Sequence, residues 1–268
     1  MNALRTSRDI RLAGGYSEYE IDTGRDIELT FSAEEDCDVS IRITGGQNIR
    51  LRTYTAAGVK ATYLFWNETE EKLELDESHE VMHDADLHLA YCEANRADTK
   101  RNTWVALREE GAKARVSSAA LVMNDKHFDI DVVSCKPHTY GYMDNYSVVL
   151  EGGRYYMNAI GKIVKGAYGS ESHQTSRSLS FDKEQRSEII PTLLIDENDV
   201  QASHAMTVGR VDEDVLYYMM SRGLTMAQCT HLISTGYLLP IAATIDNEDL
   251  QKKLREELEE KIERLCSM

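Results

Sequence analysis

The chain has 268 residues, of which 42% are hydrophobic and 28% are charged, and its formal net charge is −16. This length is enough for one large domain or two modest ones with a proper core. No segment carries a basic stripe that would offset the negative charge, so neither a nucleic acid nor an anionic membrane is an expected partner. No apolar run reaches the ~18 residues that a membrane-spanning helix needs.

The N-terminal segment and the cysteines indicate a cytoplasmic protein. The segment MNALRTSRDIRLAGG lacks the apolar stretch of a secretory signal. The cysteines are odd in number, scattered and without a CxxC pair, which argues against a disulfide framework or a structural zinc site. We therefore expect reduced thiols, most of them small core residues. They are Cys37, Cys92, Cys135, Cys229 and Cys266.

Residues 1–24 are short, mixed and glycine-containing, and we interpret them as a lead-in that could hold one helical turn. Residues 25–210 are expected to form a β-rich body, because short runs of β-branched and aromatic residues alternate with turn residues. A spacing of roughly 8–12 residues is typical of a sandwich, a barrel or a solenoid, and periodicity alone leaves all three open. The expected strands include Ile27–Phe31, Val39–Ile43, Ile49–Tyr54, Ala61–Phe65, Leu87–Cys92, Thr103–Leu107, Ala114–Leu121, His127–Val133, Tyr146–Leu150 and Leu193–Ile195.

Residues 211–268 change to a helical period. Three acids within Asp212–Arg222 suit a helix N-terminus, and Gly223 suits the position after its end. The segment Thr225–Gln228 has a capping-box pattern, which opens a second helix that should run to about Leu239, before Pro240. A third helix is expected after Asp246 or Asn247. Its apolar stripe is Leu250, Leu254, Leu258, Ile262 and Leu265.

Two motifs could carry hydrolytic chemistry, but their context is unfavourable. His79, Glu80 and His83 form a literal HExxH, which binds zinc when a helix places both histidines one turn apart. The flanking segments predict a strand, where residues four apart are separated by ~13 Å. That distance is too long for two Zn–N bonds, so a metalloprotease is disfavoured. Asp129 and Asp131 share a strand face, and without a partner acid or base we expect a solvated surface.

The most informative stretch is Pro191–Gly223, PTLLIDENDVQASHAMTVGRVDEDVLYYMMSRG. An apolar strand meets an acidic turn, and His204 follows between the two small residues Ser203 and Ala205. By this pattern His204 lies where the β body meets the helical tail. A structural histidine is the ordinary interpretation, and a functional histidine is the alternative.

This stretch resembles the signature of the SufB/SufD family, the scaffold proteins of the SUF iron–sulfur cluster assembly system. The upstream segment HFDIDVVSCKPHTYGYMDNYSVVLEGGRYYMNAIGKIVKGAYGSESHQTSRSLSF resembles the core of the same family. The matching positions are Pro191, Leu193, Ile195, Asp199, Val200, His204, Thr207, Gly209, Asp212, Tyr218, Ser221, Arg222 and Gly223.

The resemblance implies a right-handed parallel β-helix followed by a small α-helical C-terminal domain. It implies dimerisation with a second SufB/SufD-type subunit through one end of the β-helix. It also implies binding of a SufC-like ABC ATPase through the helices, so that any ATP hydrolysis resides in that partner and this chain is not an enzyme. The alternative is a family member that is a purely structural dimerisation or docking module, without cluster contact.

The resemblance assigns His204 as the interface residue that could hold iron or a transient iron–sulfur cluster. Pro191, Asp199, Thr207, Gly209 and the helix positions Tyr218, Ser221, Arg222 and Gly223 are expected to be structural. The cysteine that SufD-like members often place two residues before the histidine is Ala202, and the glutamate of SufB-like members is Ser203. The SufB-type cysteine would fall near Arg177 and Ser178, which favours a SufD-like chain and leaves Cys135 as the remaining candidate thiol.

Overall fold

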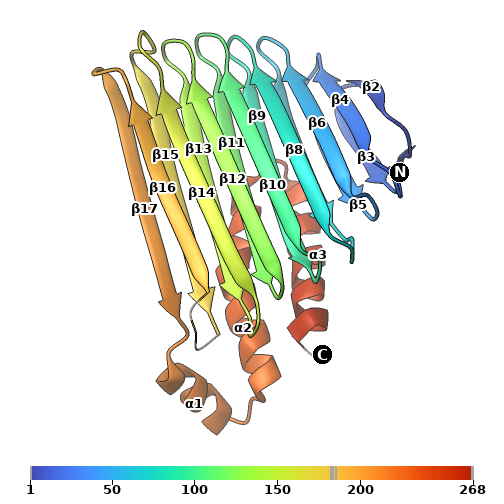
Figure 1. The fold of residues 1–268 in the computed structure, drawn as a ribbon, viewed down its shortest axis with the longest axis vertical. Coiled ribbons are helices and arrows are strands. Elements are labelled where there is room, and N and C mark those ends of the chain that lie inside the picture. The colour runs from blue at the N-terminus through green and yellow to red at the C-terminus, as the bar shows by residue number, and fades with distance from the viewer. Residues whose placement is uncertain (1, 182–183, 185, 267–268) are drawn as a thin grey trace.

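The computed structural model describes residues 2–181, 184 and 186–266. Over these residues the chain forms a parallel β-solenoid followed by a small helical region (Figure 1). Consecutive strands alternate between two sheets, so that each strand pairs in parallel with the strand two places further along the chain. The mainly β fold class is confirmed, and the sandwich and barrel alternatives are excluded.

Sheet A has nine described strands and sheet B has eight. Sheet A contains β1 (Asn2–Leu4), β3 (Gly15–Ile21), β5 (Cys37–Ile43), β7 (Lys60–Asn67), β9 (Asp86–Asn95), β11 (Lys113–Val122), β13 (Tyr140–Val149), β15 (Ser170–Ser180) and β17 (Val200–Arg210). Sheet B contains β2 (Arg8–Leu12), β4 (Ile27–Ala33), β6 (Asn48–Thr55), β8 (Leu73–Val81), β10 (Thr99–Leu107), β12 (Asp125–Ser134), β14 (Arg154–Ile163) and β16 (Ser187–Ile195).

The predicted lead-in differs from the structure. Residues 2–21 contain the strands β1, β2 and β3, which pair with the sheets, so they already belong to the solenoid and are not a lead-in to it. These first strands are short and largely exposed, which is why their apolar alternation is weak. Leu4, Ile10 and Leu12 are nevertheless buried and close this end of the core.

The core lies between the two sheets, where alternate side chains of every strand point inward. Toward the N-terminus these inward side chains are apolar and aromatic, such as Phe31, Tyr63 and Phe65. Farther along, the inward positions carry charged groups and then serines, and all of these remain buried. The interior of the solenoid is therefore not chemically uniform along its axis.

The helical region contains α1 (Glu213–Ser221), α2 (Met226–Leu238), the 3₁₀ turn η1 (Leu239–Thr244) and α3 (Glu248–Cys266). The predicted caps are confirmed: the carboxylate of Asp212 accepts the N–H of Asp214, Thr225 and Gln228 form a capping box, and Gly223 has a φ of 94°. Pro240 falls in the 3₁₀ turn. None of the helices in the described part of the chain is long and apolar enough to cross a membrane.

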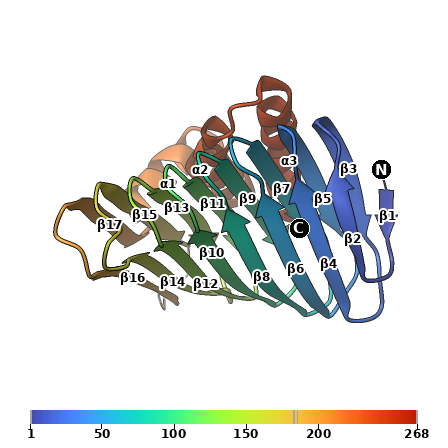
Figure 2. The same ribbon diagram turned by 90° about the horizontal axis from the view of Figure 1, so that it is seen from above.

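Helices α2 and α3 cover the outer face of sheet A (Figure 2). The predicted stripe of α3 packs there, with Leu254, Leu258 and Ile262 in one buried cluster with Trp66 and Cys92. Ion pairs flank this contact: Arg42 with Glu257, Lys253 with Glu18, and Lys261 with Glu68 at 2.7 Å. Helix α1 is different, since it has no buried residue.

Candidate functional site at the open end of the solenoid

The two ends of the solenoid differ in how their last side chains are covered. At the N-terminal end the inward residues Leu4 and Leu12 are 1% and 4% exposed. At the C-terminal end residues 201–207 of β17 are all exposed, and Met206 is 48% exposed. The strands β16 and β17 each have a neighbour on only one side, so their outer edges are unpaired. We call this surface the open end.

His204 lies in the middle of β17, at the open end. It is in register with Gln174 of β15, whose side chain is buried inside the solenoid. By the alternation of the strand, Ala202, His204 and Met206 are on this same inward side. They are nevertheless exposed, because no further coil covers them. The imidazole therefore belongs to an interior row of the solenoid that ends at solvent.

The layer beneath His204 is polar. Gln174 donates from Nε2 to the carbonyl oxygen of Thr192 on β16, at 2.9 Å, and so links the two sheets across the coil. Its Oε1 atom and the Oγ atom of Ser172 are buried without a hydrogen-bond partner. Buried polar atoms are usually paired, so this layer is incomplete in the single chain.

On the outer face of sheet A, a row of hydrogen-bonded side chains supports β17. The Nδ1 atom of His173 lies 2.7 Å from Ser203 Oγ, and its Nε2 atom lies 3.3 Å from Glu171. The ring of Tyr142 stacks on His173 with centroids 5.5 Å apart, and its hydroxyl donates to Glu171. This row holds Ser203, the residue before His204, from the face opposite to the imidazole.

The other family-motif residues surround the open end. Pro191 lies on β16 and is in register with Ala159, while Thr207 and Gly209 lie on β17. The carbonyl of Asp199 accepts the N–H of Gly169 at 2.6 Å, which joins neighbouring turns. These four residues lie in strand or turn positions around the coil that carries His204.

The remaining motif residues lie at the end of helix α1. Ser221 Oγ donates to the carbonyl of Tyr218 at 2.7 Å, and the guanidinium of Arg222 lies 5.1 Å from the ring of Tyr218. Arg222 is the C-cap, and Gly223 follows it.

Cys135 and His204 are not brought together. Cys135 lies in the turn after β12, where its thiol donates to the carbonyl of Val133 at 3.7 Å, and burial raises its pKa. Cys37 and Cys92 are buried, and burial raises the pKa of Cys37 to about 11. No cysteine of the described chain lies on β16 or β17, so the open end presents an imidazole without a thiolate of its own.

The HExxH motif forms no metal site. His79 points into the solenoid, where its Nδ1 atom lies 2.8 Å from Thr53 Oγ1, and burial lowers its pKa to about 4. His83 lies beyond the end of β8, in an exposed turn beside Asp84. Within the described residues, no group of three His, Cys, Asp or Glu side chains could hold a metal ion.

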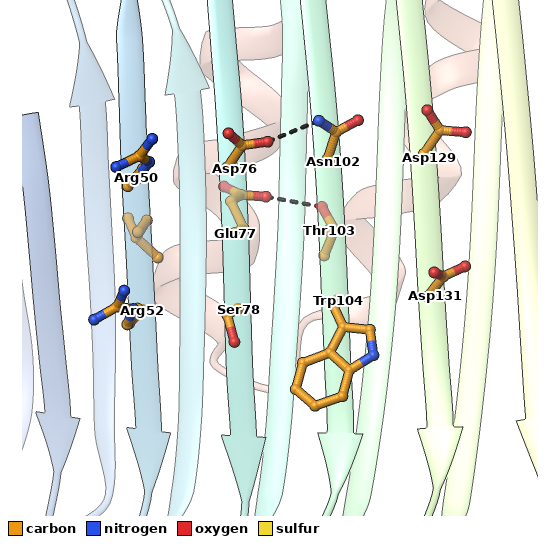
Figure 3. Close-up of a pocket in the computed structure, with 11 residues that line it drawn as sticks. Arg50, Arg52, Asp76, Glu77, Ser78, Asn102, Thr103, Trp104, Asp129 and Asp131 are labelled. Carbon is orange, nitrogen blue, oxygen red and sulfur yellow. Dashed lines mark hydrogen bonds between the residues drawn. The ribbon is translucent and has the colours of Figure 1, made fainter. Parts of the chain in front are cut away.

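Asp129 and Asp131 lie on the outer face of sheet B, as their alternation predicted, and line a shallow depression with Trp104 (Figure 3). They are half-buried and not fully solvated. Asp129 contacts His127 at 2.9 Å and accepts from Asn158 at 3.2 Å. Burial, and then the charge of Asp129, raise the pKa of Asp131.

Sequence reasoning missed a buried ionic cluster in the middle of the solenoid. The guanidinium of Arg101 contacts Glu77 at 2.6 Å and Glu93 at 2.8 Å. The ammonium of Lys126 is 3.9 Å from Glu93 and donates to Thr99 Oγ1 at 2.9 Å. The sequence did carry one sign of this cluster: along each strand, the charged residues occupy the same alternate positions as the buried apolar residues.

Helices α1 and α2 form a second exposed feature, beside the open end. With β15, β17 and the end of α3 they line a groove of about 570 Å³. Apolar side chains are exposed along α1, and Tyr217 is 76% exposed. Such a surface is typical of a protein-binding helix.

Together, these features define a class of protein: a solenoid subunit with one covered end, one open end that presents a histidine, and a helical region beside it. A family model, "SUF system FeS cluster assembly, SufBD core domain", matches residues 36–237. The chain belongs to this family, the SufB/SufD proteins, as its motif predicted.

Three curated relatives illustrate the match. The chain is 35% identical to SufD of Bacillus subtilis over 137 residues, which are 51% of this chain and 31% of that protein. It is 35% identical to an iron–sulfur cluster assembly SufBD family protein of Mycobacterium tuberculosis over 152 residues, or 56% and 18% of the two chains. It is 27% identical to SufB of B. subtilis over 144 residues, or 53% and 31%. The chain thus spans about a third or less of the length of these relatives.

Proposed function

We propose that this chain is a SufB/SufD-type scaffold subunit for iron–sulfur cluster assembly. In this proposal it dimerises through the open end, with a second copy or with another SufB/SufD-type subunit. Its C-terminal helices bind a SufC-type ABC ATPase, which carries any ATP hydrolysis, and the assembly is cytoplasmic. The relatives named as iron–sulfur cluster assembly proteins support the cellular process.

The exposed outer edge of β17, which pairs only with β15, is the observation that carries this proposal. Exposed strand edges pair readily with other chains, and proteins normally cover them when no partner exists. The strands β1 and β2 at the N-terminal end are also edge strands, but their inward residues Leu4 and Leu12 are buried, whereas residues 201–207 of β17 are all exposed. A second subunit on that surface would bury Met206 and His204 and would complete the polar layer beneath them.

In this proposal, His204 would contact the iron–sulfur cluster that is being assembled. A neutral imidazole can ligate iron, as in clusters with mixed histidine and cysteine ligands. Because β16 and β17 have no thiolate, the partner subunit or the incoming sulfide must supply the other ligands. This chain therefore contributes half of a transient site.

The groove beside α1 supports the docking of the ATPase. Helix α1 keeps its structure through its caps but buries none of its own residues. An amphipathic helix of this kind gains stability when its apolar face enters a partner's groove. Tyr217 and its exposed apolar neighbours on α1 would supply that face.

Anaerobic reconstitution with iron and sulfide tests the role in cluster assembly. The wild-type protein, in the oligomeric state that it forms, should give a brown species that His204→Ala weakens. His83→Ala changes an exposed histidine in a distant turn and serves as the matched control. Equal absorbance in the wild type and in His204→Ala would remove His204 from the site.

Co-purification with a SufC-type ATPase tests the docking. Tyr217→Asp should reduce the retained ATPase by at least about tenfold, because the partner would have to bury a charge. Tyr54→Asp, on the outer face of β6, is the control. Retention of the ATPase by Tyr217→Asp would exclude α1 as the docking helix.

The alternative function is a purely structural dimerisation or docking module. The lack of cysteine on β16 and β17 favours it, since cluster ligation normally uses thiolates. If this alternative holds, the protein should form a stable complex with the ATPase, and reconstitution with iron and sulfide should give no absorbing species in either the wild type or His204→Ala.

A further inference from the structure

Of the two polar atoms in the side-chain amide of Gln174, one has a hydrogen-bond partner and the other has none. The partner shows which atom is the nitrogen and which is the oxygen. Thr192 contributes a backbone carbonyl, which can only accept, so the group 2.9 Å from it must be the amide NH₂. The carbonyl oxygen Oε1 is therefore the atom without a partner. The residue is 2% exposed, so bulk water does not compensate this acceptor.

The residues next to Gln174 on β17 identify its prospective donor. Gln174 is in register with His204, and the flanking residues on the inward side are Ala202 and Met206. Neighbouring strands lie about 4.8 Å apart, within reach of a glutamine side chain. Of these three side chains only the imidazole can donate a hydrogen bond. His204 is exposed, so its ring can turn toward the interior.

The opposite sheet leaves room for this polar layer. A Cβ atom on Gly161 would lie 2.2 Å from Ser172 Oγ and 2.9 Å from Gln174 Nε2. The φ angle of Gly161 is not in the left-handed region, so glycine is needed here because a side chain would not fit, and not because of the backbone conformation. The coil beneath His204 is thus shaped around two polar side chains.

We propose that Gln174 is the positioning residue of the His204 site. Its Oε1 atom accepts a hydrogen bond from one ring N–H of His204 once that histidine binds a metal ion at the open end. This bond fixes the tautomer, so that the other ring nitrogen presents its lone pair outward. Metal-binding histidines commonly donate their second N–H to a fixed acceptor in this way. The inference rests on the proposed function, in which His204 binds iron or the iron–sulfur cluster under assembly.

Zn²⁺ alone is a suitable probe, with the protein in the oligomeric state that it forms. Gln174→Met keeps the length of the side chain but removes the acceptor, and it should weaken Zn²⁺ binding in calorimetry by ~10–100-fold. In nitrogen-15 NMR of the Zn²⁺-loaded wild type, one ring N–H of His204 should be protected from exchange, and Gln174→Met should lose this signal. Gln201→Met, an exposed glutamine on the outer face of β17, is the matched control.

The outcomes separate this inference from the proposed function. If His204→Ala weakens Zn²⁺ binding but Gln174→Met does not, only the role of Gln174 is wrong. If neither variant changes the affinity, the proposed binding of iron or the cluster by His204 fails as well. If Gln174→Met does not fold, the wild type still decides: a Zn²⁺-bound His204 without a protected ring N–H overturns the inference.

Discussion

At the scale of single residues, the buried ionic cluster should be sensitive to substitution. Arg101 is enclosed between Glu77 and Glu93, and its guanidinium lies 3.9 Å from the centroid of the Tyr91 ring. Removing one partner of a buried ion pair leaves an uncompensated charge, which costs about 3–5 kcal/mol. We therefore expect Arg101→Met to lower the free energy of unfolding by about that amount in urea titrations. Arg108→Met is the control, since the side chains of Arg108 and Glu80 are 41% and 43% exposed and their pair contributes at most about 1 kcal/mol.

The same interior makes stability depend on pH through His79. The pKa of His79 is lowered from 6.5 to about 4 in the folded protein, mainly because the imidazole is buried. Between those two pH values the unfolded chain binds a proton that the folded chain does not, so stability falls as the pH falls. The loss is about 1.4 kcal/mol per pH unit and ends near pH 4.

Urea titrations from pH 7 to pH 4 measure this effect as the difference between the wild type and His79→Gln, which lacks the titrating group. Other buried groups, such as His88 beneath η1, contribute equally to both proteins. The exposed His83→Gln should follow the wild-type curve. Parallel curves for the wild type and His79→Gln would show that folding does not change the pKa of His79.

At the scale of elements, apolar strands and capped helices were predictable, and polar strands were not. The run Ala114–Leu121 predicts most of β11, and the pattern around Thr225 predicts the start of α2. Strand β15 gives no such signal, because its inward residues are five serines and Gln174. Ser178, for example, accepts a hydrogen bond from Ser147 of the preceding coil and donates one to Ser187 on the opposite sheet, so such side-chain bonds compensate for the missing apolar area. These contacts join residues that are up to 31 positions apart, which no local pattern reports.

Helix α3 should act as a cover over Cys92. This thiol is 1% exposed beneath the apolar stripe that contains Leu254 and Leu258. A buried Leu→Ala change costs about 2–5 kcal/mol. Leu258→Ala should therefore raise the rate of Cys92 labelling by a thiol reagent at least about tenfold, as followed by mass spectrometry. The exposed Glu259→Ala is the matched control, and equal rates in both variants would show that α3 does not govern access to Cys92.

At the scale of the whole molecule, the sequence predicted a β body and a helical tail but not the asymmetry of the two ends. His204 was identified by its motif, and its place in an interior row follows only from the register with Gln174. That register depends on pairing between coils, as does the covering of the other end by Leu4 and Leu12. The partners of the site were therefore hidden until the coils were stacked.

A solenoid in which each coil contacts only its neighbours should have stability that varies along its axis. Hydrogen exchange followed by mass spectrometry should be slowest in β8–β12, where the ionic cluster and both neighbouring coils support each strand. It should be fastest in β17 and α1, whose residues are largely exposed. Formation of the oligomer should slow exchange in β16 and β17 and leave β1 and β2 unchanged, because the proposed interface lies at the C-terminal end. Protection that appears at β1 and β2 instead would assign the interface to the opposite end of the solenoid.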